Sequence, residues 1–213
     1  MLGGSTIPPI KKARGLTPTE KHLAKLADDT FLALWSWPNV FKKPGKELCD
    51  LLVVCGDDVL IFSDKHNAWP DGDFELAWTR WYSRAIDKSA EQVRQADRWL
   101  KKNPQAIFAD RKCQQPIPLK LPPIEQRRVH GICVAYGGED AASSYFDDPD
   151  GTFMIMPGLR GKDHVDFTLN HHRPFCIGDV DPDGPFVHVF NMESLDVVMS
   201  EFDTITDFTK YLN

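Results

Sequence analysis

The apolar residues that follow the polar N-terminal leader recur at a helical period. They are spaced three or four positions apart, at Leu23, Leu26, Ala27 and Phe31. This spacing predicts an amphipathic helix. The preceding Thr17-Pro18-Thr19-Glu20 is typical of a helix start, with a threonine N-cap, a proline at the first helical position and a glutamate that closes a capping box. We expect the helix to run to about Leu34, because Pro38 would end it.

Two short apolar runs come next, after a turn at Pro44-Gly45. Leu51-Leu52-Val53-Val54 and Val59-Leu60-Ile61-Phe62 are separated by Gly56-Asp57-Asp58, which is typical of a tight turn. Runs of this length and composition are typical of buried strands. The short connection between them predicts a β-hairpin.

The pattern from Phe74 to Lys102 is helical again, with a break expected around 87–89 and a stop at Asn103-Pro104. After a proline-rich connector, Val129 to Tyr136 is typical of another strand. The remaining pattern predicts short strands at 153–156, 165–169 and 186–190 and helices at 194–202 and 207–212. Together these elements predict an α/β fold with a central mixed sheet flanked by helices and a C-terminal segment rich in strands.

Composition narrows the class of protein. With 213 residues and 42% apolar content, the chain can bury a substantial core. A net charge of −6 argues against indiscriminate coating of nucleic acid, but not against a nuclease, since metal-binding carboxylates themselves lower the net charge. The five cysteines form no CxxC pattern, and Cys49 and Cys133 lie in apolar runs, so we expect buried thiols.

The expected location is cytoplasmic, with no membrane partner. No apolar run approaches the roughly 20 residues that span a bilayer. The leader, Met1 to Arg14, has basic residues but lacks the apolar stretch of a secretory signal.

Charged residues bracket the predicted hairpin. Glu47 and Asp50 open its first strand, and Asp64 and Lys65 close the second. Because the start of one hairpin strand lies beside the end of its partner, we expect Asp50 to lie close to Asp64 and Lys65. Carboxylates bind hard cations such as Mg²⁺ through oxygen, and a nearby lysine can orient a water molecule and neutralise phosphate charge. This combination favours phosphodiester hydrolysis.

Glu47-x-x-Asp50, an apolar hairpin and Asp64-Lys65 together resemble the metal-binding signature of the PD-(D/E)xK, or restriction-endonuclease-like, nuclease superfamily. The segment Lys88 to Trp99 resembles the helix that follows the catalytic lysine in many such enzymes. The resemblance covers about 17–136 and implies a nuclease core there, with 137–213 as an extension packed on the core. The chain looks like a divergent bacterial member.

The resemblance also implies roles for individual residues. It implies that Glu20, Glu47, Asp50 and Asp64 bind Mg²⁺ or Mn²⁺. It implies that Asp50, Asp64 and Lys65 carry out catalysis, with Gln92 placed close to the site. The expected substrate is nucleic acid, more specifically DNA, in a role such as defence against foreign DNA.

One position departs from the usual signature. The acid that normally stands two residues before the lysine is replaced by Ser63, and Asp64 would point to the opposite face of a regular strand. Three explanations follow: a β-bulge re-aims Asp64, Glu47 and Asp50 bind the metal without it, or the site is inactive.

Two other classes of function stay open. The first is a catalytically inactive nuclease-like module that binds nucleic acid or a protein partner, as a homodimer or within a larger defence complex. The second is an interaction protein of the toxin–immunity kind, with an exposed apolar patch around Trp35-Ser36-Trp37 or Trp78 to Trp81.

Other metal-binding patterns are weaker. Asp179 to Gly184 matches the opening of an EF-hand loop, but Phe190 stands where the final glutamate is required, so we expect a turn. His164, Asp166 and the pair His171-His172 offer further ligands without completing a four-ligand set.

Overall fold

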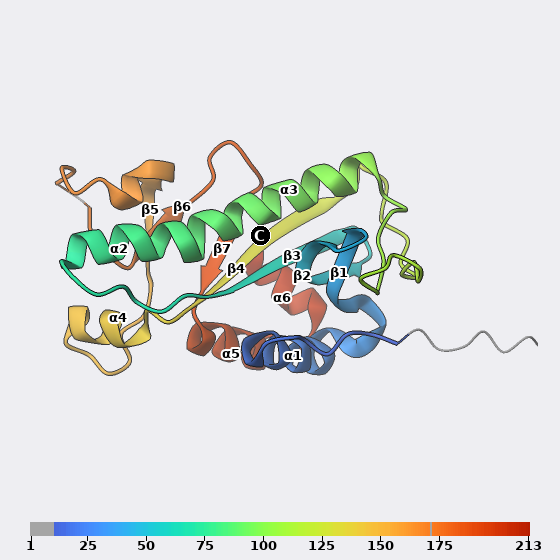
Figure 1. The fold of residues 1–213 in the computed structure, drawn as a ribbon, viewed down its shortest axis with the longest axis horizontal. Helices are drawn as coiled ribbons and strands as arrows, with labels where there is room; N and C mark the ends of the chain where they lie inside the picture. Colours follow the sequence, from blue (N-terminus) through green and yellow to red (C-terminus); the bar gives the residue numbers. More distant parts are fainter. Residues whose placement is uncertain (1–10, 171) are drawn as a thin grey trace, which may run out of the picture.

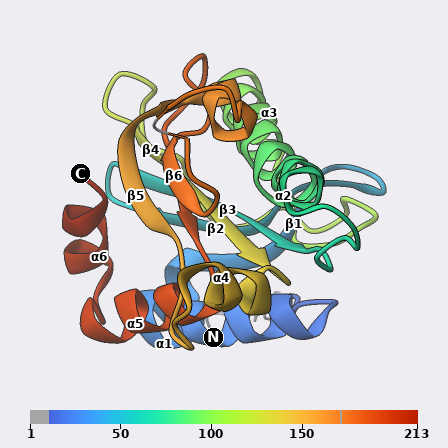
Figure 2. The same cartoon turned by 90° about the vertical axis from the view of Figure 1, so that its left-hand side faces the viewer.

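The computed structural model describes residues 11–170 and 172–213, so most of the leader and His171 lie outside the described residues. Figure 1 shows a mixed β-sheet between two helical layers. One layer contains the long helical rod of α2 and α3, and the other contains α1, α5 and α6 (Figures 1 and 2). The prediction of an α/β fold with a mixed sheet flanked by helices is therefore confirmed.

The first helix, α1 (Pro18–Trp35), begins as the sequence predicts. The Thr17 hydroxyl accepts a hydrogen bond from the Glu20 amide at 3.2 Å, and the Glu20 carboxylate accepts one from the Leu16 amide at 2.7 Å. Strand β1 (Ser36–Lys43) follows directly and was not predicted. Because β1 is at the edge of the sheet, Pro38 is accommodated there without an N–H group to donate.

The predicted hairpin is present and longer than its apolar runs. It consists of β2 (Lys46–Cys55) and β3 (Asp58–His66), paired antiparallel with Leu51 opposite Phe62. The five-stranded sheet has the order β1-β2-β3-β4-β7. Strand β4 (Arg128–Tyr136) lies parallel to β3, and β7 (Val187–Phe190) lies parallel to β4.

The predicted break in the long helical segment is a π-helical turn. Helix α2 (Phe74–Tyr82) continues through the turn η1 (Ser83–Asp87) into α3 (Lys88–Lys102). The hydrogen-bonding pattern of the helix therefore changes at 83–87, which meets the predicted break around 87–89 at Asp87. Turns of this kind are frequent at functional sites, and this one lies immediately before the α3 residues that face the candidate site.

The C-terminal segment contains strands, the two predicted C-terminal helices and one helix, α4, that was not predicted. Its elements are α4 (Glu139–Phe146), β5 (Met154–Arg160), the 3-10 turn η2 (Gly161–Val165), β6 (Cys176–Asp179), β7, α5 (Met192–Glu201) and α6 (Ile205–Leu212). Strands β5 and β6 form a separate parallel pair, whereas β7 joins the main sheet.

The strand predicted at 165–169 is wrong. This stretch follows η2, where the His164 ring nitrogen Nδ1 lies 2.7 Å from the Gly161 carbonyl oxygen. The His164 carbonyl accepts a hydrogen bond from the Trp78 indole at 2.7 Å. Polar groups of the segment are thus used in a local turn and in contacts to α2 rather than in a strand ladder, which apolar spacing alone does not reveal.

The core has one apolar cluster on each face of the sheet. Residues of α2, η1 and α3 pack on one face, and residues of α1, α5 and α6 pack on the other. Trp37, Trp78 and Trp81 are buried, and Trp35 is partly buried against the cluster on the α1 side of the sheet, so these four tryptophans pack on the core rather than form the exposed patch considered from the sequence. The five cysteines are all free, and Cys49 and Cys133 are buried as predicted. No helix within the described residues is both long and apolar enough to cross a membrane.

Candidate functional site

The predicted neighbours Asp50 and Lys65 meet on adjacent strands of the sheet. The Asp50 side chain is only 6% exposed, and its Oδ2 atom lies 3.7 Å from the Lys65 ammonium nitrogen. The same oxygen accepts a hydrogen bond of 2.7 Å from the Asp64 backbone amide. The antiparallel register of β2 and β3 produces this contact, because it places the start of β2 beside the end of β3.

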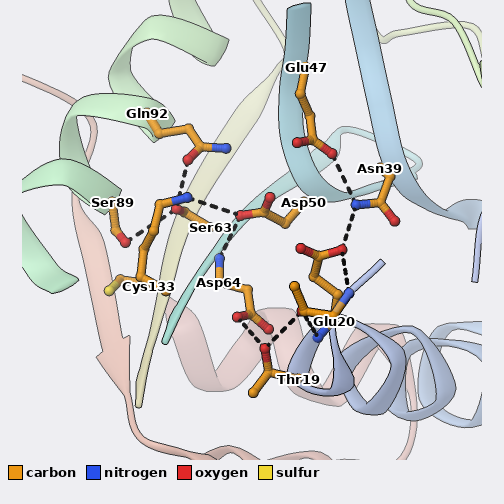
Figure 3. A network of polar contacts seen from close by, with 12 residues as sticks. Thr19, Glu20, Asn39, Glu47, Asp50, Ser63, Asp64, Ser89, Gln92 and Cys133 are labelled. Atoms are coloured by element: carbon orange, nitrogen blue, oxygen red, sulfur yellow. Dashed lines mark hydrogen bonds and ion pairs between the residues drawn. The ribbon is translucent and has the colours of Figure 1, made fainter. Parts of the chain in front are cut away.

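Ser63 and Asp64 point to opposite faces of β3. Strand β3 pairs with β4 in unbroken register from Asp58 to His66, so the bulge considered from the sequence is absent from β3. Ser63 therefore faces α3, and the Asp64 carboxylate accepts a hydrogen bond of 2.9 Å from the hydroxyl of Thr19 on α1 (Figure 3). The position two residues before Lys65 is thus occupied by the hydroxyl of Ser63. Asp64 points to the other face of β3 and does not supply a carboxylate on the face of Ser63.

Gln92, on α3, lies beside Ser63 near the end of β3. Its Oε1 atom is 3.1 Å from the Ser63 hydroxyl, which is also 3.2 Å from the hydroxyl of Ser89. Ser89 donates in turn to the Ala85 carbonyl, inside the π-helical turn, at 2.7 Å. The helical rod and β3 are therefore joined by buried polar contacts next to Asp50.

Glu20 and Glu47 are brought together by a residue that the sequence analysis did not identify. The Asn39 amide nitrogen lies 3.0 Å from Glu20 Oε2 and 3.0 Å from Glu47 Oε1. Figure 3 shows Glu20, Glu47 and Asp50 directed toward a common region, with Asn39 on its far side. Asn39 follows a proline, which is common in turns, so its sequence context carried no signal for this role.

Burial and mutual repulsion disfavour charge on Glu47, Asp50 and Asp64. Burial raises the pKa of Glu47 to about 7, with Asp50 and Glu20 adding to the rise and the Asn39 hydrogen bond opposing it. Burial likewise raises the pKa of Asp64 to about 7, against the Thr19 hydrogen bond and with the repulsion of Asp50 and Glu20. The pKa of Asp50 is also raised by burial, and Lys65 opposes that rise.

A hard divalent cation fits the chemistry of this donor set. Glu20, Glu47 and Asp50 supply oxygen ligands, which Mg²⁺ and Mn²⁺ prefer. Burial first, and repulsion between the carboxylates second, raise the pKa of Glu47 and of Asp50, and a bound cation would favour the charged form of both. Within 11–170 and 172–213, however, no three acidic, histidine or cysteine side chains are already gathered as a metal-binding group.

The other metal-ligand patterns are explained by local structure. His164 is fully buried and bonds to the backbone of its own turn and of Gly178. Asp181, in the acidic 179–184 stretch, forms an ion pair of 2.9 Å with Arg94. His171 lies outside the described residues. Comparisons of the chain with protein families, curated proteins and solved structures found no match.

Proposed function

We propose that this protein is a metal-dependent nuclease that hydrolyses phosphodiester bonds, with DNA as its substrate and Mg²⁺ or Mn²⁺ as its cofactor. The observation that carries the proposal is the Asp50–Lys65 contact of 3.7 Å, with two further carboxylates beside it. The element order supports it: a helix, three antiparallel strands, a helical rod and a parallel strand. The resemblance to the PD-(D/E)xK superfamily implies a helix, a hairpin, a helix and a strand in this order, and β1 is an addition to it.

Each side chain of the site would have a distinct role in hydrolysis. Asp50, Glu47 and Glu20 would hold the cation, which lowers the pKa of a bound water molecule and stabilises charge on phosphate oxygens. Lys65 would orient that water molecule or neutralise phosphate charge from its place beside Asp50. Gln92, close to Ser63 and to Asp50, would fix the direction of these polar groups.

Asp64 would contribute indirectly. Its carboxylate points to Thr19 on α1, while its backbone amide donates to Asp50. It therefore supports the position of Asp50 through the main chain and adds negative charge to the site through its side chain.

One observation favours the alternative of a catalytically inactive nuclease-like module. Ser63 stands where the second acid is expected, and its hydroxyl is occupied by Gln92 and Ser89. Such a module would keep the fold and would bind nucleic acid or a protein partner, but it would not hydrolyse phosphodiester bonds.

Cleavage assays separate the two proposals. Supercoiled plasmid and single-stranded DNA would be incubated with Mg²⁺ or Mn²⁺ and with wild type, Asp50→Ala or Lys65→Ala. We expect metal-dependent cutting by wild type and its loss in both variants, with Asp203→Ala, at an exposed residue of the α5–α6 connection, as the matched control. Equal cutting by wild type and both variants would refute the assigned site. If wild type does not cut but binds DNA, the inactive module is supported.

A further inference from the structure

Asn39 on β1 is buried among the acidic side chains of the candidate site. It is 1% exposed, and its amide nitrogen donates to carboxylates from two different elements, Glu20 of α1 and Glu47 of β2. The chemistry fixes the orientation of the amide. If it were reversed, its carbonyl oxygen would face two carboxylates and repel both.

The backbone at Asn39 adopts an unfavourable conformation next to this contact. Its φ angle is 47°, in the left-handed region that disfavours residues with a Cβ atom, although asparagine tolerates it better than most. Its neighbours keep regular strand pairing, Pro38 with Leu51 and Val40 with Cys49. The register of β1 against β2 then shifts between Val40 and Phe41 and again between Phe41 and Lys43, so Asn39 lies at the start of an irregular stretch of the edge strand.

The carbonyl oxygen of the Asn39 side chain, Oδ1, makes no such contact within the part of the chain that the structure describes. Asn39 Oδ1 is buried and has no hydrogen-bond partner among the described residues. Unpaired buried polar atoms and left-handed non-glycine residues are both unfavourable, and both concentrate at functional sites. Two such features in one residue indicate that the double donation to Glu20 and Glu47 has a use.

We propose that Asn39 is a positioning residue that links Glu20 to Glu47 and so presets both carboxylates for a divalent cation. The cation role rests on the proposed function. A neutral amide suits this task because it holds two carboxylates without neutralising them, whereas lysine or arginine would replace the cation. Aspartate, with no amide hydrogens, would repel both partners.

Manganese binding tests the role of the amide separately from the backbone. Asn39→Gly removes the side chain while favouring the left-handed conformation, so a purely conformational role would be preserved. Asp147→Gly is the matched control, since Asp147 is exposed, has a φ of 51° and ends α4. By titration calorimetry we expect Asn39→Gly to bind Mn²⁺ about 10-fold or more weakly, as for other partners of metal ligands, and Asp147→Gly to match wild type. Wild-type affinity in Asn39→Gly would overturn the proposal.

A double-mutant cycle distinguishes failure of this inference from failure of the proposed function. Urea unfolding of Asn39→Gly, Glu47→Ala and the double variant measures whether the two side chains interact. We expect non-additivity of about fivefold in the unfolding equilibrium constant. Coupling without Mn²⁺ binding by wild type would keep the link and refute the metal site. Additive effects would overturn the link itself, whatever the protein binds.

Discussion

Replacing Asp64 with asparagine should make the protein more stable above neutral pH. The Asp64 side chain is 7% exposed, with one oxygen bonded to Thr19 and the other buried without a partner among the described residues. Asparagine has the same shape and keeps an acceptor for Thr19. Its amide group would take the place of the unpaired oxygen, beside the hydroxyl of Tyr136.

The magnitude follows from the pKa of Asp64. Burial, with repulsion from Asp50 and Glu20, raises this pKa from 3.8 to about 7. At 1.36 kcal/mol per pKa unit, keeping the folded carboxylate charged costs about 4 kcal/mol above pH 7. Relaxation of neighbouring side chains and water reduces such penalties, so we expect Asp64→Asn to gain about 2 kcal/mol at pH 8.

The sign of the pH dependence is fixed by the raised pKa. Between about pH 4 and pH 7 the folded state binds more protons at this site than the unfolded state, so the contribution of Asp64 to stability falls as the pH rises. Glu47, with its pKa raised from 4.5 to about 7, contributes in the same direction. The gain from Asp64→Asn should therefore be near zero at pH 4 and largest above pH 7.

Urea unfolding at pH 4, 6 and 8 would measure this gain. The control is Asp203→Asn, which removes an equal charge from an exposed position. Lower stability of Asp64→Asn than of wild type at pH 8, or a gain over wild type that does not change with pH, would show that burial of the Asp64 carboxylate does not destabilise the folded state.

Three further substitutions test the fold and the site. Thr17→Ala removes the N-cap of α1 and should lower the free energy of unfolding by about 1 kcal/mol in urea titrations; an unchanged value would show that the capping box is dispensable. Gly131→Ala would place a Cβ atom 2.7 Å from the Val93 side chain, so we expect the free energy of unfolding to fall by about 2 kcal/mol or more. A thermal midpoint equal to that of wild type would contradict this close packing. Lys65→Met removes the positive charge beside buried Asp50. Because burial already raises the pKa of Asp50, the variant should be less stable than wild type at pH 8 and should recover toward pH 5. A loss of stability that is independent of pH would refute the pairing of Lys65 with Asp50.

Local signals in the sequence were sufficient for several elements. The capping box at Thr17, the β2–β3 hairpin and the start of α2–α3 depend on residues adjacent in the chain, and the structure contains all of them. The period of a strand also indicated that Asp64 faces away from Ser63, and the contact with Thr19 agrees with this.

Features that depend on distant residues were missed. Strand β1 contains Pro38 and is possible because of its edge position, which is a property of the whole sheet. Asn39 matters only because α1 and β2 bring Glu20 and Glu47 to it. The helix also continues through the π-helical turn at 83–87. The sequence predicted a break around 87–89, but it did not reveal that the break is a π-helical turn or that it begins at Ser83.

A Mn²⁺ titration followed by electron paramagnetic resonance measures whether Asp50 helps bind a divalent cation. The free-ion signal should be suppressed by wild type and by Asp203→Asn, because both retain the carboxylates of the site. Asp50→Asn keeps an acceptor for the Asp64 amide but loses the charge, so it should leave the free-ion signal largely intact. Equal uptake of Mn²⁺ by wild type and Asp50→Asn would contradict the account.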